Sequence, residues 1–249
     1  MAKHSHFDNI KRSKAVVDAQ RGKIFTVHAR LVAIAARTGG DPVMNATLKA
    51  AIEHAKAANV PNANIERAIK KGTGEDKDGA ALEEATYEAF GPEGVVFMID
   101  VITDNKNRAL GNLRLGLMKN GGNIGSSGSV AWKFDKKAYF SVDAHGKSPD
   151  EVELTLIDCG ADDFELDEGK YEVYAGWEKL GEVKKAIQAA GFTVEKDELI
   201  WKPKEKLVLN DLETAKTVLR LMEVLEGDDD VMRVTTNAEV DEALLPQLG

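Results

Sequence analysis

Residues 85–102 read ATYEAFGPEGVVFMIDVI, and this stretch decides the fold class of the region around it. Residues 85–90 and 95–102 are rich in residue types that favour strands, and the turn GPEG between them is a strong hairpin signal. Apolar residues then recur at helical spacing over 105–119, and a further strand is predicted at 130–134. The predicted order of elements is therefore strand, strand, helix, strand.

The chain beyond residue 134 predicts a second mixed unit. Its elements follow the order βαββαβ, which is that of a ferredoxin-like domain. After it, Asp211 can cap a helix, and a last strand is predicted at 231–235. These two elements need a sheet, and the nearest incomplete sheet is the first one. The elements predicted for the inserted unit are strands at 138–142, 164–166, 171–175 and 193–201, and helices at 149–158 and 180–190.

The N-terminal third is predicted to be helical. Apolar residues recur at helical spacing from about residue 9 to residue 37, and a break near Gly22 is an alternative to one continuous helix. A second helix can open at Asp41 or at Asn45, and a third has Gly72 as its C-terminal cap. The polar, glycine-rich run that follows indicates a domain boundary.

Together these elements predict an α+β protein of three domains. An N-terminal three-helix domain is followed by two α/β (ferredoxin-like) domains, one of which is inserted in the other. The predicted boundaries are 1–80 for the basic helical domain, 81–134 plus 205–240 for the discontinuous α/β domain, and 135–204 for the inserted ferredoxin-like domain.

Charge is divided unevenly along the chain. The whole chain has a net charge of -9, but residues 1–74 hold 13 Lys and Arg against 5 Asp and Glu, a net of +8. The remaining residues hold 20 against 37, a net of -17. Such asymmetry suggests that the N-terminal part meets a polyanion such as a nucleic acid. A basic helical face that is simply solvated is the alternative interpretation.

Basic residues alternate with apolar ones along the first predicted helix. Lys23, Arg30 and Arg37 are spaced by seven residues, so they would line one face about 10 Å apart. Such a row can meet successive phosphates along a groove, with affinity but little sequence specificity. The basic residues of this stretch are Lys11, Arg12, Lys14, Arg21, Lys23, Arg30 and Arg37.

Residues 121–129, GGNIGSSGS, resemble a phosphate-cradling loop in composition. The segment follows a helix and precedes a strand, whereas nucleotide-binding loops follow a strand and open a helix. A flexible connection that presents backbone N–H groups to a partner is the alternative. The residues of this candidate second contact are Gly121, Gly122, Asn123, Ser126, Ser127 and Ser129.

Other kinds of chemistry find no support in the sequence. Cys159 is the single cysteine, so an internal disulfide and cysteine-based metal sites are excluded. The acidic run at 162–168 lacks the pattern of a calcium loop, and no nucleophile and base stand in a catalytic order. No apolar run approaches the ~20 residues of a membrane span. We therefore expect no metal, no cofactor, no enzymatic activity, no membrane partner and a cytoplasmic location.

A series of short motifs follows along essentially the whole chain. They are HS at 4–5, NIK at 9–11, RGKIFT at 21–26, GDP at 40–42, KAANVP at 56–61, NIERAIKKGTG at 64–74, YEAFGP at 87–92, TDNKNR at 103–108, GGNIG at 121–125 and GSVAW at 128–132. Each motif alone is weak, but in this order they resemble the YebC/PmpR family. The chain differs from the usual family motifs at Lys3, His6, Phe7, Ala46 and Lys49.

The resemblance implies three domains, with one α/β domain inserted in the other, and no cofactor. It also assigns residues to a nucleic-acid-binding surface. The basic surface that it implies consists of Lys11, Arg21, Lys23, Arg67, Lys70 and Lys71, with the loop 121–129 as a second contact.

Members of the family that the chain resembles are described in two ways, as DNA-binding transcriptional regulators and as activators of translation or ribosome-associated factors that relieve stalling. Both activities require phosphate contacts. We therefore expect a nucleic-acid-binding regulator of gene expression with no small-molecule substrate. A DNA-binding transcriptional regulator is the first hypothesis, and a translation factor that binds ribosomal RNA or tRNA is the alternative.

Overall fold

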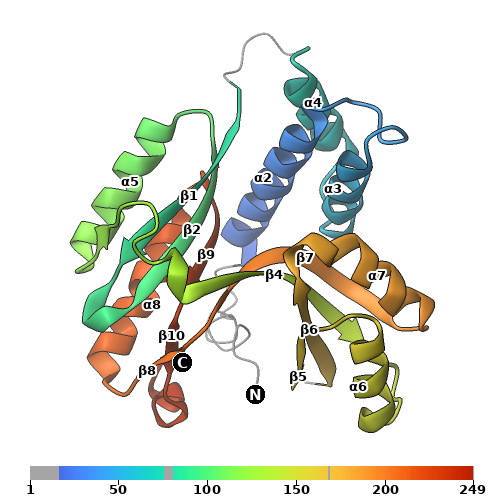
Figure 1. The fold of residues 1–249 in the computed structure, drawn as a ribbon. Helices are drawn as coiled ribbons and strands as arrows, with labels where there is room; N and C mark the ends of the chain where they lie inside the picture. Colours follow the sequence, from blue (N-terminus) through green and yellow to red (C-terminus); the bar gives the residue numbers. More distant parts are fainter. Residues whose placement is uncertain (1–16, 76–80, 168, 249) are drawn as a thin grey trace. The chain divides into compact units, whose positions relative to one another are not determined.

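The computed structural model describes residues 17–75, 81–167 and 169–248 (Figure 1). They form two compact units. One unit is built from Ala131–Val208, and the other from the described parts of Lys11–Val130 and Leu209–Gly249. The first unit therefore lies in the chain between two segments of the second. The architecture is α+β as predicted, with helices first and antiparallel sheets after them.

The larger unit begins with three helices, α2 (Val17–Ala36), α3 (Ala46–Ala57) and α4 (Asn62–Thr73). α3 and α4 both pack chiefly on α2. α2 continues through Gly22, so a break there is wrong. Of the two predicted starts of the second helix, Asn45 is correct, because its side chain accepts a hydrogen bond from the backbone N–H of Leu48 at 3.0 Å.

The end of α4 corrects the sequence-based expectation. The residue that ends the helix in the left-handed conformation is Gly74, with φ at 77°, and not Gly72. Gly72 lies inside the last turn, where an added Cβ would clash with the backbone oxygen of Ala33 in α2. A glycine is required at position 72 because the two helices approach closely there, which single-sequence reasoning does not distinguish from a cap.

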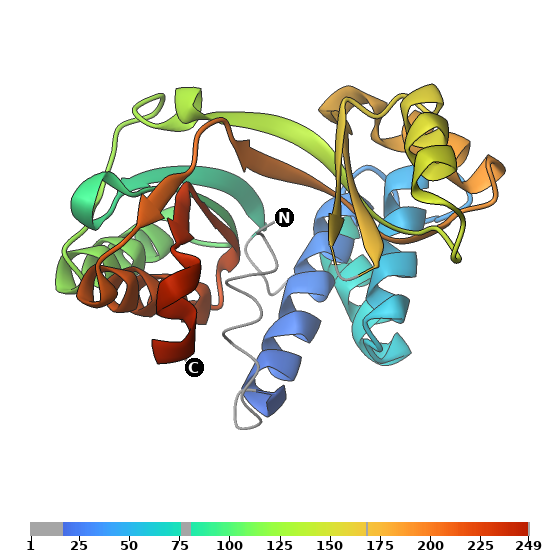
Figure 2. The same ribbon diagram turned by 90° about the horizontal axis from the view of Figure 1, so that it is seen from below.

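The first sheet of the larger unit has the order β3-β1-β2-β9. Its strands are antiparallel: β1 (Glu83–Phe90), β2 (Val96–Thr103), β3 (Asn123–Ile124) and β9 (Val231–Thr236). The predicted hairpin joins β1 to β2 through the short 3-10 helix η1 (Pro92–Gly94). Figures 1 and 2 show α5 (Lys106–Lys119) and α8 (Leu212–Gly227) side by side on one face of this sheet. The returning α8 and β9 complete the sheet, as the sequence predicts.

The strand predicted at 130–134 is wrong. Residues Ala131–Lys133 form a 3-10 turn, η2, and Phe134 opens a strand of the other unit. The strand that follows α5 is instead the two-residue β3, which pairs with Ala89 and Phe90. Two residues carry no periodicity, so the sequence pattern gives no signal for it.

Three further short elements lie in the part of the chain after β7. The strands β8 (Leu207–Leu209) and β10 (Ala238–Val240) pair with each other, and a 3-10 helix, η4 (Glu242–Gln247), follows β10. Strands of three residues are too short for an alternating pattern to be recognised, so the sequence does not predict them.

The unit formed by residues 131–208 has the predicted βαββαβ order. Its antiparallel sheet is arranged β5-β6-β4-β7, the strand order of a ferredoxin-like fold, and both helices pack on one face of it. The elements are β4 (Phe134–Asp143), α6 (Pro149–Asp158), β5 (Asp163–Asp167), β6 (Lys170–Gly176), η3 (Trp177–Lys179), α7 (Leu180–Ala189) and β7 (Thr193–Pro203).

In the larger unit, the helices and the first sheet share one apolar core. Val32, Leu48 and Ile65 from the three helices are buried in one cluster with Leu82 and Ile102 from the start of the α/β part. The helical segment is thus packed against the sheet and is not an isolated bundle. The predicted domain boundaries, which divide this unit near residue 80, stay a prediction.

None of the helices in the described part of the chain combines the length and the apolar character that a membrane crossing requires.

We predict that Gly72→Ala destabilises the protein by about 1–3 kcal/mol, because the new methyl group has to push α4 away from α2. Gly111→Ala is the matched control. Gly111 lies in the interior of α5, and an added Cβ meets no atom within 4 Å there. The control should therefore gain about 0.5–1 kcal/mol from helix propensity. Urea unfolding measures both changes, and equal effects of the two substitutions would contradict the close approach.

Candidate nucleic-acid interface

The exposed face of α4 carries three cations. Its apolar residues Ile65 and Ala68 are buried, whereas Arg67 and Lys70 are exposed and Lys71 is half-buried. Within the described part of the chain, none of the three cationic side chains makes an ion pair or a hydrogen bond. Their charge is therefore available to an anion outside the protein.

The face of α2 that carries a cation at every seventh residue is not exposed in the way that the α4 face is. Lys23 donates from Nζ to the backbone oxygen of Asp228 at 3.1 Å, and Arg37 donates to the backbone oxygen of Leu82 at 3.2 Å. Arg30 pairs with the Asp230 carboxylate at 2.8 Å and is only 19% exposed. The three residues do share a face, but this face is turned towards the α/β part of the same unit.

This arrangement changes the interpretation of the α2 row. Cations that already hold acidic or carbonyl groups of the protein are not an open row of phosphate ligands. The backbone of Arg21 lies in the second turn of α2. The predicted contacts Lys11, Arg12 and Lys14 lie outside the described residues.

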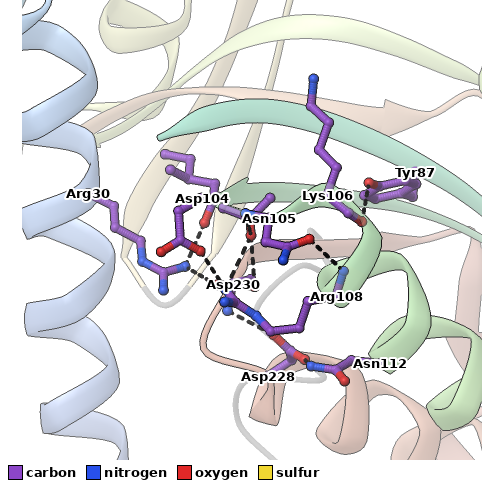
Figure 3. A network of polar contacts seen from close by, with 11 residues as sticks. Arg30, Tyr87, Asp104, Asn105, Lys106, Arg108, Asn112, Asp228 and Asp230 are labelled. Carbon is purple, nitrogen blue, oxygen red and sulfur yellow. Dashed lines mark hydrogen bonds and ion pairs between the residues drawn. The ribbon is translucent and has the colours of Figure 1, made fainter. Parts of the chain in front are cut away.

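A buried carboxylate, that of Asp230, organises the contact between α2 and the α/β part (Figure 3). Besides the ion pair with Arg30, it accepts hydrogen bonds from the Thr103 hydroxyl at 2.9 Å and from Arg108 at 2.8 Å. Burial alone would raise the pKa of this carboxyl group, but the hydrogen bonds from Arg108, Thr103 and Arg30 hold the pKa of Asp230 below its usual value. Asp230 is therefore charged and fully engaged at neutral pH.

The residues around Asp230 explain one of the sequence motifs. In TDNKNR at 103–108, Thr103 and Arg108 hold Asp230, Asn105 caps α5 by accepting from the Arg108 backbone N–H, and Asp104 pairs with the Arg108 side chain at 2.8 Å. The motif therefore has a structural role, since it holds Asp230 and caps α5. Sequence reasoning missed Asp228 and Asp230, because an acidic run between a helix and a strand is indistinguishable from a solvated loop in the sequence. The polar string at 103–108 was the only available signal.

The glycine-rich loop holds an anion that belongs to the protein itself. The carboxylate of Glu88, which is 7% exposed, accepts hydrogen bonds from the backbone N–H groups of Gly128 at 2.5 Å and Val130 at 2.6 Å. The N–H of Gly125 donates to the Glu88 backbone oxygen at 2.8 Å. These N–H groups are the ones that a cradled phosphate would need. The loop is therefore closed by an internal carboxylate.

The candidate residues of this loop differ in how far they are exposed to solvent. Gly121 is exposed and has φ at 77°, whereas Gly122 is buried against β1. Ser129 is half-buried. The exposed polar side chains of the loop are those of Asn123, which begins β3, and of Ser126 and Ser127. An external partner could therefore meet these side chains, but not the N–H groups that Glu88 holds.

Two family models match nearly the whole chain. The model described as the TACO1/YebC protein N-terminal domain matches residues 5–75, and the model described as the TACO1/YebC second and third domain matches residues 82–238. The chain belongs to the TACO1/YebC family. The resemblance seen in the motifs is thereby confirmed.

Curated relatives of this TACO1/YebC chain carry the name "Probable transcriptional regulatory protein". One from Pelotomaculum thermopropionicum is 46% identical over 97% of this chain and 100% of the relative. One from Aquifex aeolicus is 44% identical over the full length of both. A crystal structure of a conserved hypothetical protein from Aquifex aeolicus has a TM-score of 0.83 and 43% identity, covering 94% of this chain and 96% of the other. The chain therefore has the fold of this family, whose curated relatives are named as probable transcriptional regulatory proteins.

We predict that Asp230→Asn lowers stability by about 2–3 kcal/mol. The substitution leaves Arg30 without its carboxylate partner, and the cost is below that of a fully buried pair because Arg108 is 49% exposed. Asp229→Asn is the matched control, since Asp229 is the exposed neighbour. Chemical denaturation of both variants measures the difference, and equal stabilities would refute the role of Asp230 as a hub.

The stability of the wild-type protein should also depend on pH through Asp230. Because the pKa of this group is lower in the folded than in the unfolded chain, its contribution is present above the unfolded value of about 4 and is lost as pH falls through the folded value. The free energy of unfolding should therefore fall more steeply below pH ~4 in the wild type than in Asp230→Asn. Parallel acid profiles would contradict the assignment.

Proposed function

We propose that this protein is a non-enzymatic regulator of gene expression that binds the phosphate backbone of DNA with the exposed face of α4. The observation that carries the proposal is the contrast between the two basic helices. The cations of α2 at positions 23, 30 and 37 hold groups of the protein itself, whereas Arg67, Lys70 and Lys71 of α4 have no such partner among the described residues. Phosphate binding rests on such uncommitted cations.

The position of the cations within α4 supports binding to the backbone with little base reading. In a helix-turn-helix protein the N-terminal residues of the second helix contact base edges. Here the N-terminal half of α4 carries Asn62 and Asn64, and the cations lie in its second half. Lys49 and Lys56 of α3 are exposed and add to the positive charge of the helical segment. Such a surface gives affinity that tolerates many sequences.

The acidic remainder of the chain complements this surface. Residues 75–249 have a net charge of -17 and would repel a polyanion, so the basic helices define which side of the larger unit a nucleic acid approaches. The proposal includes no catalysis. The Glu88 carboxylate already holds N–H groups of the glycine-rich loop, and burial, with a smaller contribution from Asp158, raises the pKa of the Cys159 thiol and makes it less reactive.

The alternative is a translation factor that binds structured RNA with the same cations. It is favoured by the position of the α4 cations in the second half of the helix, away from the end that reads bases in a helix-turn-helix protein, because proteins recognise double-helical RNA mainly by shape and backbone. The two hypotheses share the interface and differ only in the target.

We predict that Arg67→Glu combined with Lys70→Glu weakens binding to duplex DNA about equally for unrelated sequences. The slope of log K against log salt should become shallower by about two, because two phosphates are no longer neutralised by the protein. Arg114→Glu combined with Arg220→Glu is the control, since both arginines are exposed in α5 and α8 and the change in net charge is identical. If the control weakens binding as much as the α4 variant, net charge and not the α4 face decides affinity.

The target is tested by sedimentation of cell lysate through a sucrose gradient, with and without RNase. If the protein acts on DNA, it should remain at the top of the gradient in both cases, and promoter fragments should be recovered with it in a parallel pull-down. Migration with ribosomal particles that RNase abolishes would replace the first hypothesis by the alternative.

A further inference from the structure

All three tryptophans of the chain lie at one end of the sheet in the unit formed by residues 131–208. Trp132 lies in η2, immediately before β4 begins. Trp177 follows Gly176, the last residue of β6, whose register partner is Lys137 near the start of β4. Trp201, near the end of β7, is the register partner of Lys136. The pairing of the three strands thus places Trp177 and Trp201 near the start of β4, and Trp132 lies just before that start.

Two of these rings are unusually exposed. Trp132 is 65% exposed and Trp177 is 45% exposed, although tryptophan is a side chain that folding normally buries to a large extent. Each ring has a lysine over it: Lys133 Nζ lies 5.4 Å from the centre of the Trp132 ring, and Lys136 Nζ lies 5.1 Å from that of Trp177. A solvent-exposed indole beside an ammonium group offers both a stacking face and a positive charge.

The charge of this end of the sheet is opposite to that of the rest of the unit. Segments 131–137, 177–179 and 201–206 together contain seven lysines against three acidic residues. The rest of 131–208 contains five lysines against fifteen acidic residues. Among the described residues, Lys133, Lys136 and Lys179 form no ion pair. The positive charge is therefore concentrated where the tryptophans are.

The face of the same sheet that lies opposite the helices also carries aromatic side chains, but it does not suit contact with a nucleic acid. Tyr139 and Tyr174 lie there, but Tyr174 is only 2% exposed, and both hydroxyls donate to the Glu172 carboxylate, at 3.4 and 3.1 Å. Asp163 and Glu165 are also on this face and contact Lys202. Lysines lie over these rings as well, but Lys196 and Lys202 are both paired with acids, so this face offers no comparable surface.

We propose that Trp132, Lys133, Lys136, Trp177 and Lys179, the tryptophan–lysine surface, bind unpaired bases of a single-stranded nucleic acid. The indole rings stack on bases, and the lysines neutralise the neighbouring phosphates. Stacking on an aromatic ring tolerates every base because each has a π-face, so the surface has little sequence preference. This site lies in a different unit from the α4 face and has a different ligand form, an unpaired strand. It extends the proposed function with residues that the α4 proposal does not use.

The test uses the intrinsic fluorescence of the full-length protein, to which only the three tryptophans contribute indole emission. Unlabelled 12-nucleotide oligouridylate and oligothymidylate should each quench this emission in a saturable way. A duplex of the same length should bind without comparable quenching. Quenching by the RNA strand alone or the DNA strand alone would support the surface and identify its ligand, and no quenching by either would overturn the proposal.

Substitutions of the tryptophans test whether single strands bind at this surface. Anisotropy of a labelled single strand should show binding weakened roughly tenfold by Trp132→Ala or by Trp177→Ala, whereas the phenylalanine variants should retain most of the affinity. Leu154→Ala is the control, since Leu154 is a 66% exposed apolar side chain of the same unit. Circular dichroism checks that each variant is folded. Unchanged single-strand affinity in both Trp132→Ala and Trp177→Ala would overturn the proposal.

The two proposals fail in distinguishable ways. Arg67→Glu combined with Lys70→Glu should weaken duplex binding and leave the quenching by single strands in place. Duplex binding without any response to single strands would refute the tryptophan–lysine surface and leave the proposed function intact. Quenching by polyglutamate as strong as that by the oligonucleotides would refute it as well, because the surface would then recognise acidic protein segments.

Discussion

The buried carboxylate of Asp230 is the interaction on which the larger unit depends. It accepts from Arg30 of α2, from Thr103 at the end of β2 and from Arg108 of α5, so one charged group joins three elements. Breaking any one of these contacts would leave a buried charge incompletely paired, which is expensive. Asp230 comes from the segment that follows the inserted unit in the chain. The returning segment thus adds a charged contact to the apolar core that already joins the helical segment to its sheet.

Oxygen atoms of the protein itself occupy the two places where the sequence most suggests phosphate binding. The sequence offers two places with phosphate-binding character, the cations of α2 and the glycine-rich loop. In the structure Asp230 lies against the first and Glu88 closes the second. Cationic side chains and convergent N–H groups would attract phosphate, but here they already hold carboxylate or backbone carbonyl oxygens of the protein itself. Of the two basic helical faces, that of α4 is the one whose charges find no counterpart among the described residues, and for this reason we propose it as the phosphate contact.

The sequence predicts the elements with strong periodicity and fails where a decision depends on distant residues. The hairpin β1–β2, the helix α6 and the cap of α8 by Asp211 follow from local patterns, and the ferredoxin-like order is correct as well. The partner of Arg30 is Asp230, far along the chain, so helical spacing identifies the face and cannot say what covers it. Gly72 shows the same limit, because its glycine is required by Ala33 of a neighbouring helix and not by the local backbone. The candidate site was therefore predicted as a set of cations, while the division between internal and external partners needed the fold.

The aromatic residues are also distributed unevenly between the two units. The described helical segment contains no tryptophan, whereas the other unit joins exposed indole rings to a local excess of lysine. The two proposals thus place phosphate contact and base stacking in different units of one chain. Two weak sites on one polypeptide raise each other's effective concentration for a strand that carries both a paired and an unpaired region. Where one strand reaches both proposed sites, it is held more tightly than a plain duplex or a plain single strand, which gives selectivity for structure without any residue that reads sequence.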